Sequence, residues 1–350
     1  MKDFLTDSFG RKIDYLRLSV TDRCNLRCAY CMPSEGVPQI KHKDILTYEE
    51  IIRSVKILAG LGIRKVRITG GEPLVRKGVI SLIGSLNNIE GIEEVSLTTN
   101  GVLLKDCAGD LYAAGLSRIN ISLDTLDARK YRLLTRGGEL KFVIDSIHSA
   151  LRTGIRSVKI NAVLSDLFDL EDAYDLIAFG KKEAIDIRFI EMMYPAFADT
   201  IDPLRNIECS TAFISPENKS GKSQRMVLKE DIFRIMKQFG NYHKVDEYKG
   251  CGPSVYYKID GMASNVGFII NSKDICCSCN RARLTPDGLV RLCLFSNLEL
   301  SLKDMLRADV TDEAIKEKLK DFIKIKPENR DAVCKSMGFK LSDYMNRIGG

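Results

Sequence analysis

The sequence contains no tryptophan, only three histidines and no hydrophobic run long enough to cross a membrane. A transmembrane helix needs about 20 consecutive apolar residues, so we expect no membrane partner. His42, His148 and His243 are widely separated along the chain. Because zinc sites commonly use imidazole ligands, these few histidines disfavour zinc, and a metal site would have to rely mainly on other side chains.

The chain also has no apolar signal core at its start and no strong excess of charge. Residues 1–7 carry acidic side chains early, which predicts an uncleaved cytoplasmic protein. The net charge of +6 over 350 residues is a modest surplus. It is compatible with a small anionic partner or with a solvated basic face, and we expect no nucleic-acid partner.

Cysteine is the residue whose distribution is unusual. The chain has eleven cysteines, an odd number that suits a disulfide framework poorly. Six of them form two tight groups, which indicates metal binding in a reducing compartment. The other five are expected to be ordinary thiols: Cys107, Cys209, Cys251, Cys277 and Cys334.

Cys24, Cys28 and Cys31 follow a strand-like run at residues 15–20 and have the spacing C-x3-C-x2-C. A closed zinc site or iron-sulfur cluster normally takes four ligands. Three thiolates on a cubane leave one iron open, and this pattern resembles the radical SAM superfamily, whose open iron binds S-adenosylmethionine (SAM). Tyr30 would lie beside the adenine of SAM. Zinc and free structural cysteines are the alternatives.

Short β-rich runs alternate with helical patterns up to about residue 191, which predicts a parallel sheet with helical crossovers. Six strand-helix units are fewer than the eight of a closed barrel, so we expect a partial (β/α)6 TIM-type barrel of the radical SAM kind. The predicted strands are 15–20, 65–69, 94–98, 118–122, 157–163 and 186–191. One predicted helix follows a capping box that begins at Thr47. Further helices are predicted at 104–114, 141–153 and 170–182.

The alternation stops beyond residue 194, and we place a domain boundary there. Residues 1–194 are the expected barrel and residues 195–350 an α+β region. In that region we expect a polar loop at 218–223, a helix at 229–239, paired strands at 255–260 and 265–270, a hairpin turn at 286–288, and charged helical segments at 301–322 and 326–337.

Several polar motifs come directly after predicted strands: Gly70-Gly71-Glu72-Pro73, Thr98-Thr99-Asn100-Gly101, Ser122-Leu123-Asp124 and Glu191-Met192-Met193. Each alone has an ordinary explanation as a turn or a core residue. Ligands bind at the carboxyl ends of parallel strands, so the group indicates a binding site. Gly71 and Ser122 are suited to contact SAM.

A second cysteine group consists of Cys276, Cys279 and Cys293, with spacing C-x2-C-x13-C if Cys277 is passed over. Three ligands again leave an open iron, and zinc is again the alternative. Either Cys276 or Cys277 could be the first ligand. Because adjacent thiols seldom reach one cluster without strain, Cys277 is the expected bystander.

Five cations stand at alternating positions of predicted strands: Arg17, Arg67, Lys159, Arg281 and Arg283. Alternate residues of a strand point to the same side, and guanidinium groups suit phosphate oxygens. If they point inward, the barrel is lined by cations and one ligand is a polyanion. If they point outward, they are solvated surface charges.

The chain as a whole resembles the GTP 3',8-cyclases, the family of molybdenum cofactor biosynthesis protein A. The motifs that carry the resemblance are Phe9-Gly10-Arg11, the Thr21-Asp22-Arg23-Cys24 stretch, Gly70-Gly71-Glu72-Pro73, Arg188-Phe189-Ile190-Glu191, Cys279-Asn280-Arg281, Arg283-Leu284-Thr285 and the terminal Ile348-Gly349-Gly350. The first cysteine motif identifies only the superfamily. The second motif and the double-glycine end narrow it to this family.

The resemblance implies two 4Fe-4S clusters, one on Cys24, Cys28 and Cys31 and one on Cys276, Cys279 and Cys293. It implies SAM contacts from Tyr30, Gly71, Ser122 and Met193, and GTP contacts from Arg17, Arg67, Thr98, Lys159, Arg281 and Arg283. The 5'-deoxyadenosyl radical would abstract the ribose 3' hydrogen, and the resulting carbon radical would attack guanine C8. Arg17 is the candidate catalytic residue that assists reduction of the aminyl radical.

The implied product is (8S)-3',8-cyclo-7,8-dihydroguanosine 5'-triphosphate, which a cyclic pyranopterin monophosphate synthase uses next. A flavodoxin or ferredoxin would donate electrons, and the chain would be a monomer or homodimer. Gly349 and Gly350 would reach the active site. A radical SAM enzyme that modifies peptides is the alternative function, and a redox-sensing iron-sulfur regulator is the non-enzymatic one.

Overall fold

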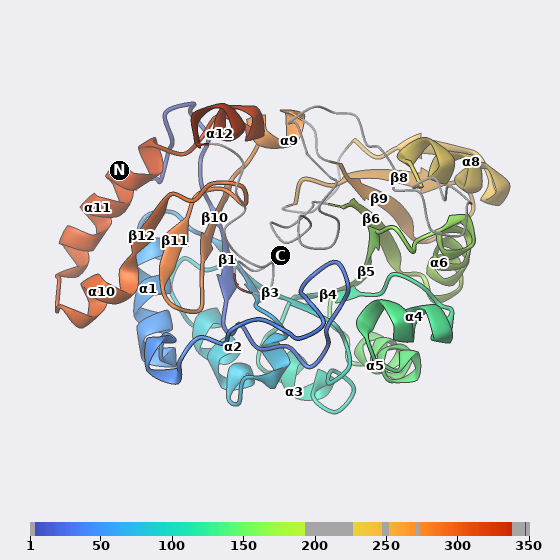
Figure 1. Cartoon of the computed structure of the whole chain (residues 1–350), viewed down its shortest axis with the longest axis horizontal. Coiled ribbons are helices and arrows are strands. Elements are labelled where there is room, and N and C mark those ends of the chain that lie inside the picture. The colour runs from blue at the N-terminus through green and yellow to red at the C-terminus, as the bar shows by residue number, and fades with distance from the viewer. Residues whose placement is uncertain (1–3, 193–226, 247–251, 271–272, 338–346, 348–350) are drawn as a thin grey trace.

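A single mixed sheet of twelve strands organises the computed structural model, which describes residues 4–192, 227–246, 252–270, 273–337 and 347 (Figure 1). The strand order is β12-β11-β10-β1-β2-β3-β4-β5-β6-β9-β8-β7. The strands are β1 (Tyr15–Ser19), β2 (Lys65–Thr69), β3 (Glu94–Thr99), β4 (Arg118–Ser122), β5 (Ser157–Leu164), β6 (Asp186–Glu191), β7 (Tyr242–Lys244), β8 (Val255–Ile259), β9 (Asn265–Ile269), β10 (Arg281–Leu284), β11 (Leu289–Arg291) and β12 (Glu299–Ser301).

Strands β1 to β6 pair in parallel, in chain order, and helices lie on their outer side (Figure 1). This arrangement confirms the predicted α/β fold class. The helices are α1 (Tyr48–Gly60), α2 (Val79–Asn87), α3 (Ala108–Ala113), α4 (Ala128–Thr135), α5 (Leu140–Arg152), α6 (Leu170–Glu183), α8 (Lys229–Phe239), α9 (Lys273–Cys277), α10 (Leu302–Arg307), α11 (Asp312–Lys324) and α12 (Arg330–Met337).

Alternation along the strands separates a core from a site. Leu16 and Leu18 of β1 are fully buried in the hydrophobic core, and burying such a side chain contributes about 1.5–3 kcal/mol. Arg17 stands between them, and successive side chains of a strand point to opposite faces. The same alternation places Arg67 between Val66 and Ile68 of β2. The face opposite the core is therefore polar.

Helix α1 begins where the sequence predicts it. The Glu50 N–H donates to Thr47 Oγ1 at 3.2 Å, and the Thr47 N–H donates to Glu50 Oε2 at 2.8 Å. This reciprocal pair satisfies two N–H groups at the start of the helix. Ile51, Val55 and Leu58 then follow one another on the buried side of the helix.

Some helices differ from the prediction. Helices α2, α4 and α9 were not predicted. Helix α2 carries β-branched residues and an interior glycine, Gly84, which weaken its helical pattern. The helix expected at 104–114 begins only at Ala108. The segment expected at 301–322 is divided into α10 and α11, because Thr311 caps a new helix by accepting from the Ala314 N–H.

Strands of the C-terminal region extend both sides of the parallel strands. Strand β10 pairs in parallel with β1, and β9 pairs in parallel with β6. The predicted pairing of β8 with β9 and the hairpin between β10 and β11 are confirmed as antiparallel. The loop predicted at 218–223 lies outside the described residues. Because β10 pairs with β1, Arg281 and Arg283 lie beside β1.

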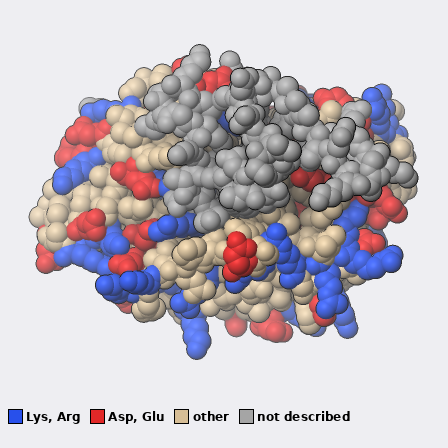
Figure 2. All heavy atoms as spheres, viewed as in Figure 1, with Lys and Arg blue, Asp and Glu red and all other residues tan. Residues whose placement is uncertain are grey.

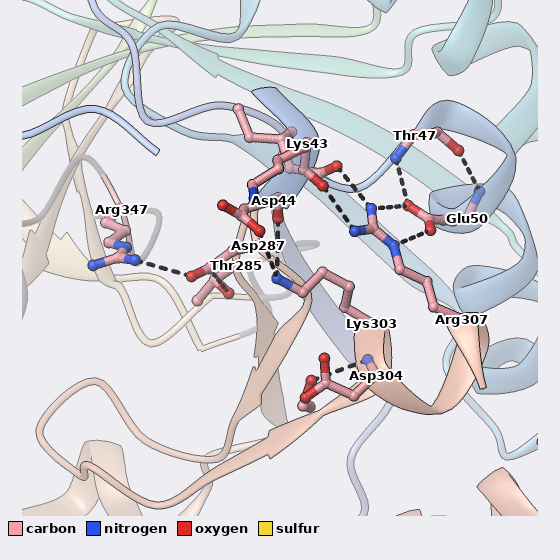
Figure 3. A network of polar contacts seen from close by, with 12 residues as sticks. Lys43, Asp44, Thr47, Glu50, Thr285, Asp287, Lys303, Asp304, Arg307 and Arg347 are labelled. Carbon is pink, nitrogen blue, oxygen red and sulfur yellow. Dashed lines mark hydrogen bonds and ion pairs between the residues drawn. The ribbon is translucent and has the colours of Figure 1, made fainter. Parts of the chain in front are cut away.

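Polar contacts attach helix α10 to the N-terminal half of the chain (Figure 3). Arg307 Nε lies 2.7 Å from Glu50 Oε1, and its Nη1 donates to the Lys43 carbonyl at 2.7 Å. On the face drawn in Figure 2, basic and acidic side chains are interspersed. Within the described ranges, no helix combines the length and the apolar character needed to cross a bilayer.

Candidate active site

A cavity of about 350 Å³ lies on the polar face of the sheet and extends from the first residues of β1, β3 and β4 to the carboxyl ends of the parallel strands. Residues from β1 to β6 and from β8 to β10 line it. The predicted site residues that it brings together are Arg17, Cys24, Cys28, Tyr30, Cys31, Arg67, Gly71, Thr98, Ser122, Lys159, Arg281 and Arg283. Met193 lies outside the described residues, whereas its neighbour Met192 lines the cavity. All five cations line the cavity, so of the two orientations that the sequence left open the structure has the inward one.

The loop that carries the first cysteine group is held against the end of β2. The Gly71 N–H donates to the Thr21 carbonyl at 2.8 Å, and the Glu72 N–H donates to the Arg23 carbonyl at 2.8 Å. A Cβ atom on Gly71 would lie 2.3 Å from the Arg23 carbonyl oxygen. Glycine at position 71 is thus required for this close approach of two backbone segments.

We expect Gly71→Ala to destabilise the protein by about 1–3 kcal/mol, because the added methyl group meets backbone atoms that cannot rotate away. Gly84→Ala is the matched control: its Cβ would meet no atom within 4 Å, and it lies inside α2. Alanine should stabilise that helix by up to about 1 kcal/mol. Urea unfolding of the apoproteins measures both changes. Equal stability of Gly71→Ala and the parent would contradict the packing described here.

Glu72 connects the loop after β2 with the loop after β3. Its buried carboxylate accepts hydrogen bonds from the Leu74 N–H at 3.0 Å, the Thr99 hydroxyl at 2.8 Å and the Asn100 N–H at 2.6 Å. Burial raises the pKa of Glu72 to about 7, against the opposing effect of these donors. The Asn100 side-chain amide lies 3.7 Å from Cys24 Sγ. Glu72 therefore aligns a strand end with the cysteine loop.

The first three cysteines form no disulfide, and Cys28 lies close enough to Cys24 and Cys31 to interact with both. Burial, followed by the charges of Cys31, Asp124 and Cys24, raises the pKa of Cys28 well above its usual value. Such mutually repelling thiols suit a shared metal centre that takes thiolate ligands. Among the described residues, no three potential ligands converge closely enough to hold a single ion. The donor set fits an iron-sulfur cluster.

Tyr30 is fixed at the wall of the cavity. Its hydroxyl donates to Asp124 Oδ2 at 2.7 Å, and Asp124 Oδ1 accepts from the Val163 N–H at 2.8 Å. Burial raises the pKa of Asp124 to about 6. The Tyr30 ring is therefore held in place by groups from the ends of β4 and β5.

Three arginines form a row across neighbouring strands. In the strand register, Arg17 of β1 is aligned with Arg283 of β10 on one side and with Arg67 of β2 on the other. Aligned residues of parallel strands point to the same face. All three side chains are lining residues of the cavity. The row is a direct consequence of the insertion of β10 beside β1.

This row is electrostatically unfavourable by itself. Burial, then repulsion from Arg283, Arg67 and Arg281, lowers the pKa of Arg17 well below its usual value, although Tyr15 opposes this effect. Burial and Arg281 lower the pKa of Arg283 to about 10. Buried like charges need compensation by an opposite charge. The cavity is therefore suited to a ligand with several negative charges.

Sequence reasoning missed Arg188 as a lining residue, although it quoted the motif that contains it. Arg188 of β6 is buried, and its Nε and Nη2 donate to Asn161 Oδ1 at 2.8 and 2.6 Å. Lys159 Nζ lies 3.2 Å from the Tyr256 hydroxyl and 3.4 Å from Asp186 Oδ2. The signal was a charged residue at an inward position between apolar neighbours, the same signal that identified Lys159.

The second cysteine group lies beside this cavity, next to β10. Cys276, Cys279 and Cys293 are free and partly buried. They are not lining residues of the cavity, whereas Arg281 and Leu294, near them in sequence, are. Burial raises the pKa of Cys279, but Lys326 and Arg281 more than offset it and lower the pKa to about 7. This electropositive surrounding suits thiolate ligands.

We expect Cys277→Ser to retain full iron content and activity, because Cys277 is exposed while Cys276 is partly buried and interacts with Cys279 and Cys293. Cys276→Ser is the matched comparison and should lose iron. Iron analysis and electron paramagnetic resonance (EPR) spectroscopy of both variants measure the difference. Loss of the second cluster signal in Cys277→Ser alone would make Cys277 the ligand.

Known proteins resemble this chain over its whole length. The model of the Radical SAM superfamily matches residues 18–180, and that of Molybdenum Cofactor Synthesis C matches residues 204–332. The GTP 3',8-cyclase of Peptoclostridium acidaminophilum is 42% identical over 351 residues, which cover 100% of this chain and 99% of the relative. That of Thermodesulfovibrio yellowstonii is also 42% identical, over 99% of this chain and 100% of its own.

A solved structure supports the fold. The crystal structure of Streptococcus suis SuiB bound to S-adenosylmethionine has a TM-score of 0.57 and 15% sequence identity, covering 87% of this chain and 68% of that one. At this identity the likeness concerns the fold alone. The two domain models and the full-length relatives together cover nearly the whole chain. The chain belongs to the GTP 3',8-cyclase family of radical SAM enzymes.

Proposed function

We propose that this enzyme cyclises GTP to (8S)-3',8-cyclo-7,8-dihydroguanosine 5'-triphosphate, an early step of molybdenum cofactor biosynthesis. The observation that carries the proposal is the aligned row of Arg283, Arg17 and Arg67 in the same cavity as the first cysteine group. A triphosphate supplies the negative charge that this row needs. A radical generated from SAM at the cysteine group would form in the same cavity as the bound nucleotide.

The first cysteine group and its neighbours in the cavity would bind the cluster and SAM through different contacts. Cys24, Cys28 and Cys31 would bind a 4Fe-4S cluster, which when bound supplies the electron for cleavage of SAM. Tyr30 would contact the adenine, and its bond to Asp124 keeps it in place. Ser122 would bond to SAM. Gly71 would approach SAM closely, but its N–H is engaged by Thr21.

The cations and Thr98 would hold GTP. Arg17, Arg67, Lys159, Arg281 and Arg283 would bind the phosphates, and Thr98 would position the nucleoside. Arg17, at the centre of the row, is also the candidate that assists reduction after ring closure. Cys276, Cys279 and Cys293 would hold a second 4Fe-4S cluster near the guanine. We also propose the division into a barrel of residues 1–194 and a C-terminal region of residues 195–350.

The end of the chain has a described anchor. Gly349 and Gly350, predicted to enter the active site, lie outside the described residues. Arg347 Nη2 donates to Asp287 Oδ2 at 3.0 Å (Figure 3). Asp287 also accepts from the Thr285 hydroxyl at 2.6 Å. This contact joins Arg347 to the hairpin that begins with β10, which carries Arg281 and Arg283.

Anaerobic incubation of reconstituted enzyme with SAM, dithionite and each nucleoside triphosphate in turn tests the function. Mass analysis should find a SAM-dependent cyclised isomer only with GTP. Peptide modification by the same protein would favour the alternative of a peptide-modifying radical SAM enzyme. Absence of SAM cleavage by the reconstituted protein would favour a redox-sensing regulator and contradict the proposal.

Partners follow from the chemistry. A flavodoxin or ferredoxin would donate the electron, and a cyclic pyranopterin monophosphate synthase would take up the product. Cluster ligation by free thiols suits a reducing compartment, so the proposal includes a cytoplasmic location. The enzyme would act as a monomer or a homodimer.

A further inference from the structure

A buried lysine lies behind the second cysteine group. Lys326 follows the end of α11 and is only 2% exposed. Its ammonium donates to the Arg281 carbonyl at 3.0 Å and to the Leu292 carbonyl. Arg281 is two residues after Cys279, and Leu292 directly precedes Cys293. One side chain thus connects the two backbone segments that carry two of the three thiols.

Within the described part of the chain, the hydrogen-bond partners of the Lys326 ammonium are backbone carbonyls. Among the described residues, no Asp or Glu lies within ion-pair distance of it. The charges nearest to it are the cations Arg11 and Arg281, which repel it, and the thiols of Cys279 and Cys293, which attract it when ionised. An uncompensated buried cation is strongly unfavourable. Two of the proposed cluster ligands, Cys279 and Cys293, are thus close enough to act on this buried charge.

Arg11 connects the residues that follow Lys326 to Cys276. Its Nη1 donates to the Cys276 carbonyl at 2.8 Å and to the Glu328 carbonyl at 2.7 Å, and its Nη2 donates to the Pro327 carbonyl at 2.7 Å. The residues that follow Lys326 are therefore bonded through Arg11 to Cys276, the remaining cysteine of the group. Lys326 has a fixed place relative to all three thiols, independently of any titration.

We propose that Lys326 is a positioning residue for the second cluster, holding the segments of Cys279 and Cys293 in place and raising the reduction potential of the cluster by its fixed positive charge. The inference rests on the proposed second cluster. Reduction adds one electron to the cluster and breaks no bond in the protein. A buried cation stabilises the more negative, reduced state, and charge near a cluster is a known determinant of its potential.

The test uses the full chain with Cys24, Cys28 and Cys31 replaced by alanine, so that only the second cluster contributes to the spectrum. In this background, Lys326→Met removes the charge and Lys326→Arg keeps it. Lys324→Met is the matched control, because Lys324 is two residues away, 62% exposed and paired with Asp321 at 2.8 Å. Circular dichroism checks the fold, iron analysis the loading, and an EPR-monitored dithionite titration the midpoint potential.

We expect Lys326→Met either to lower the midpoint potential or to lose iron, with Lys326→Arg and Lys324→Met close to the parent. An unchanged potential and iron content in Lys326→Met would overturn the proposal. Equal losses in Lys326→Met and Lys326→Arg would overturn the role of the charge. If the background protein with Lys326 intact binds no cluster, the second cluster itself is refuted, an outcome distinct from failure of Lys326.

Discussion

Replacing Cys28 by alanine is expected to abolish both reductive SAM cleavage and GTP cyclisation. Cys28 lines the cavity and interacts with Cys24 and Cys31, so its removal leaves two ligands where the proposed first cluster needs three. Cys279→Ala should behave differently, because Cys279 is not a lining residue of the cavity. It should leave slow SAM cleavage that is no longer coupled to cyclisation.

Chromatographic measurement of 5'-deoxyadenosine and of cyclised nucleotide, under dithionite, separates the two activities. Cys107→Ser is a suitable control, since Cys107 precedes α3, makes no side-chain capping hydrogen bond and is not among the residues of either cysteine group. It should retain both activities. Full cyclisation by Cys279→Ala would show that the second cysteine group does not serve the reaction, and SAM cleavage by Cys28→Ala would refute the first cluster.

The parallel strands could be predicted because each one is a short apolar run bounded by turns or charges. The predicted bounds of β2, β4 and β6 agree with the structure. The places of β9 and β10 in the sheet, beside β6 and β1, could not be predicted. They depend on long-range pairing, such as the donation from the Asp14 and Tyr15 N–H groups to the Asn280 carbonyl at 3.2 Å. No local pattern records which strand will accept a distant neighbour.

Most residues that line the candidate site could be predicted, but the contacts that hold them in place could not. The cysteine spacing and the motifs after the strands identified most lining residues, because parallel strands bring their carboxyl ends together. The contacts that hold those residues were not predicted. Glu72 bonding to Asn100, and Lys326 reaching the carbonyls beside Cys279 and Cys293, join segments far apart in sequence. Such supporting contacts depend on tertiary packing that the sequence pattern does not display.

Arg17→Met is expected to weaken GTP binding and yet to leave the apoprotein equally or more stable. Each hydrogen bond to an ionised phosphate contributes about 1.5–3 kcal/mol, so affinity should fall by roughly ten- to a hundredfold. In the apoprotein, burial and the charges of Arg283, Arg67 and Arg281 disfavour the charged form of Arg17. Methionine fills similar space without that repulsion.

Calorimetric titration with GTP and thermal unfolding without it measure these opposite effects. Arg129→Met is the control, since Arg129 is an exposed cation on α4 and should change neither quantity. A variant Arg17→Met that bound GTP normally but unfolded earlier would mark Arg17 as structural. Turnover at saturating GTP tests whether Arg17 also assists reduction after ring closure. If it does, the rate of product formation by Arg17→Met stays low even when the weakened site is full. If Arg17 only binds phosphate, the variant regains the parental rate.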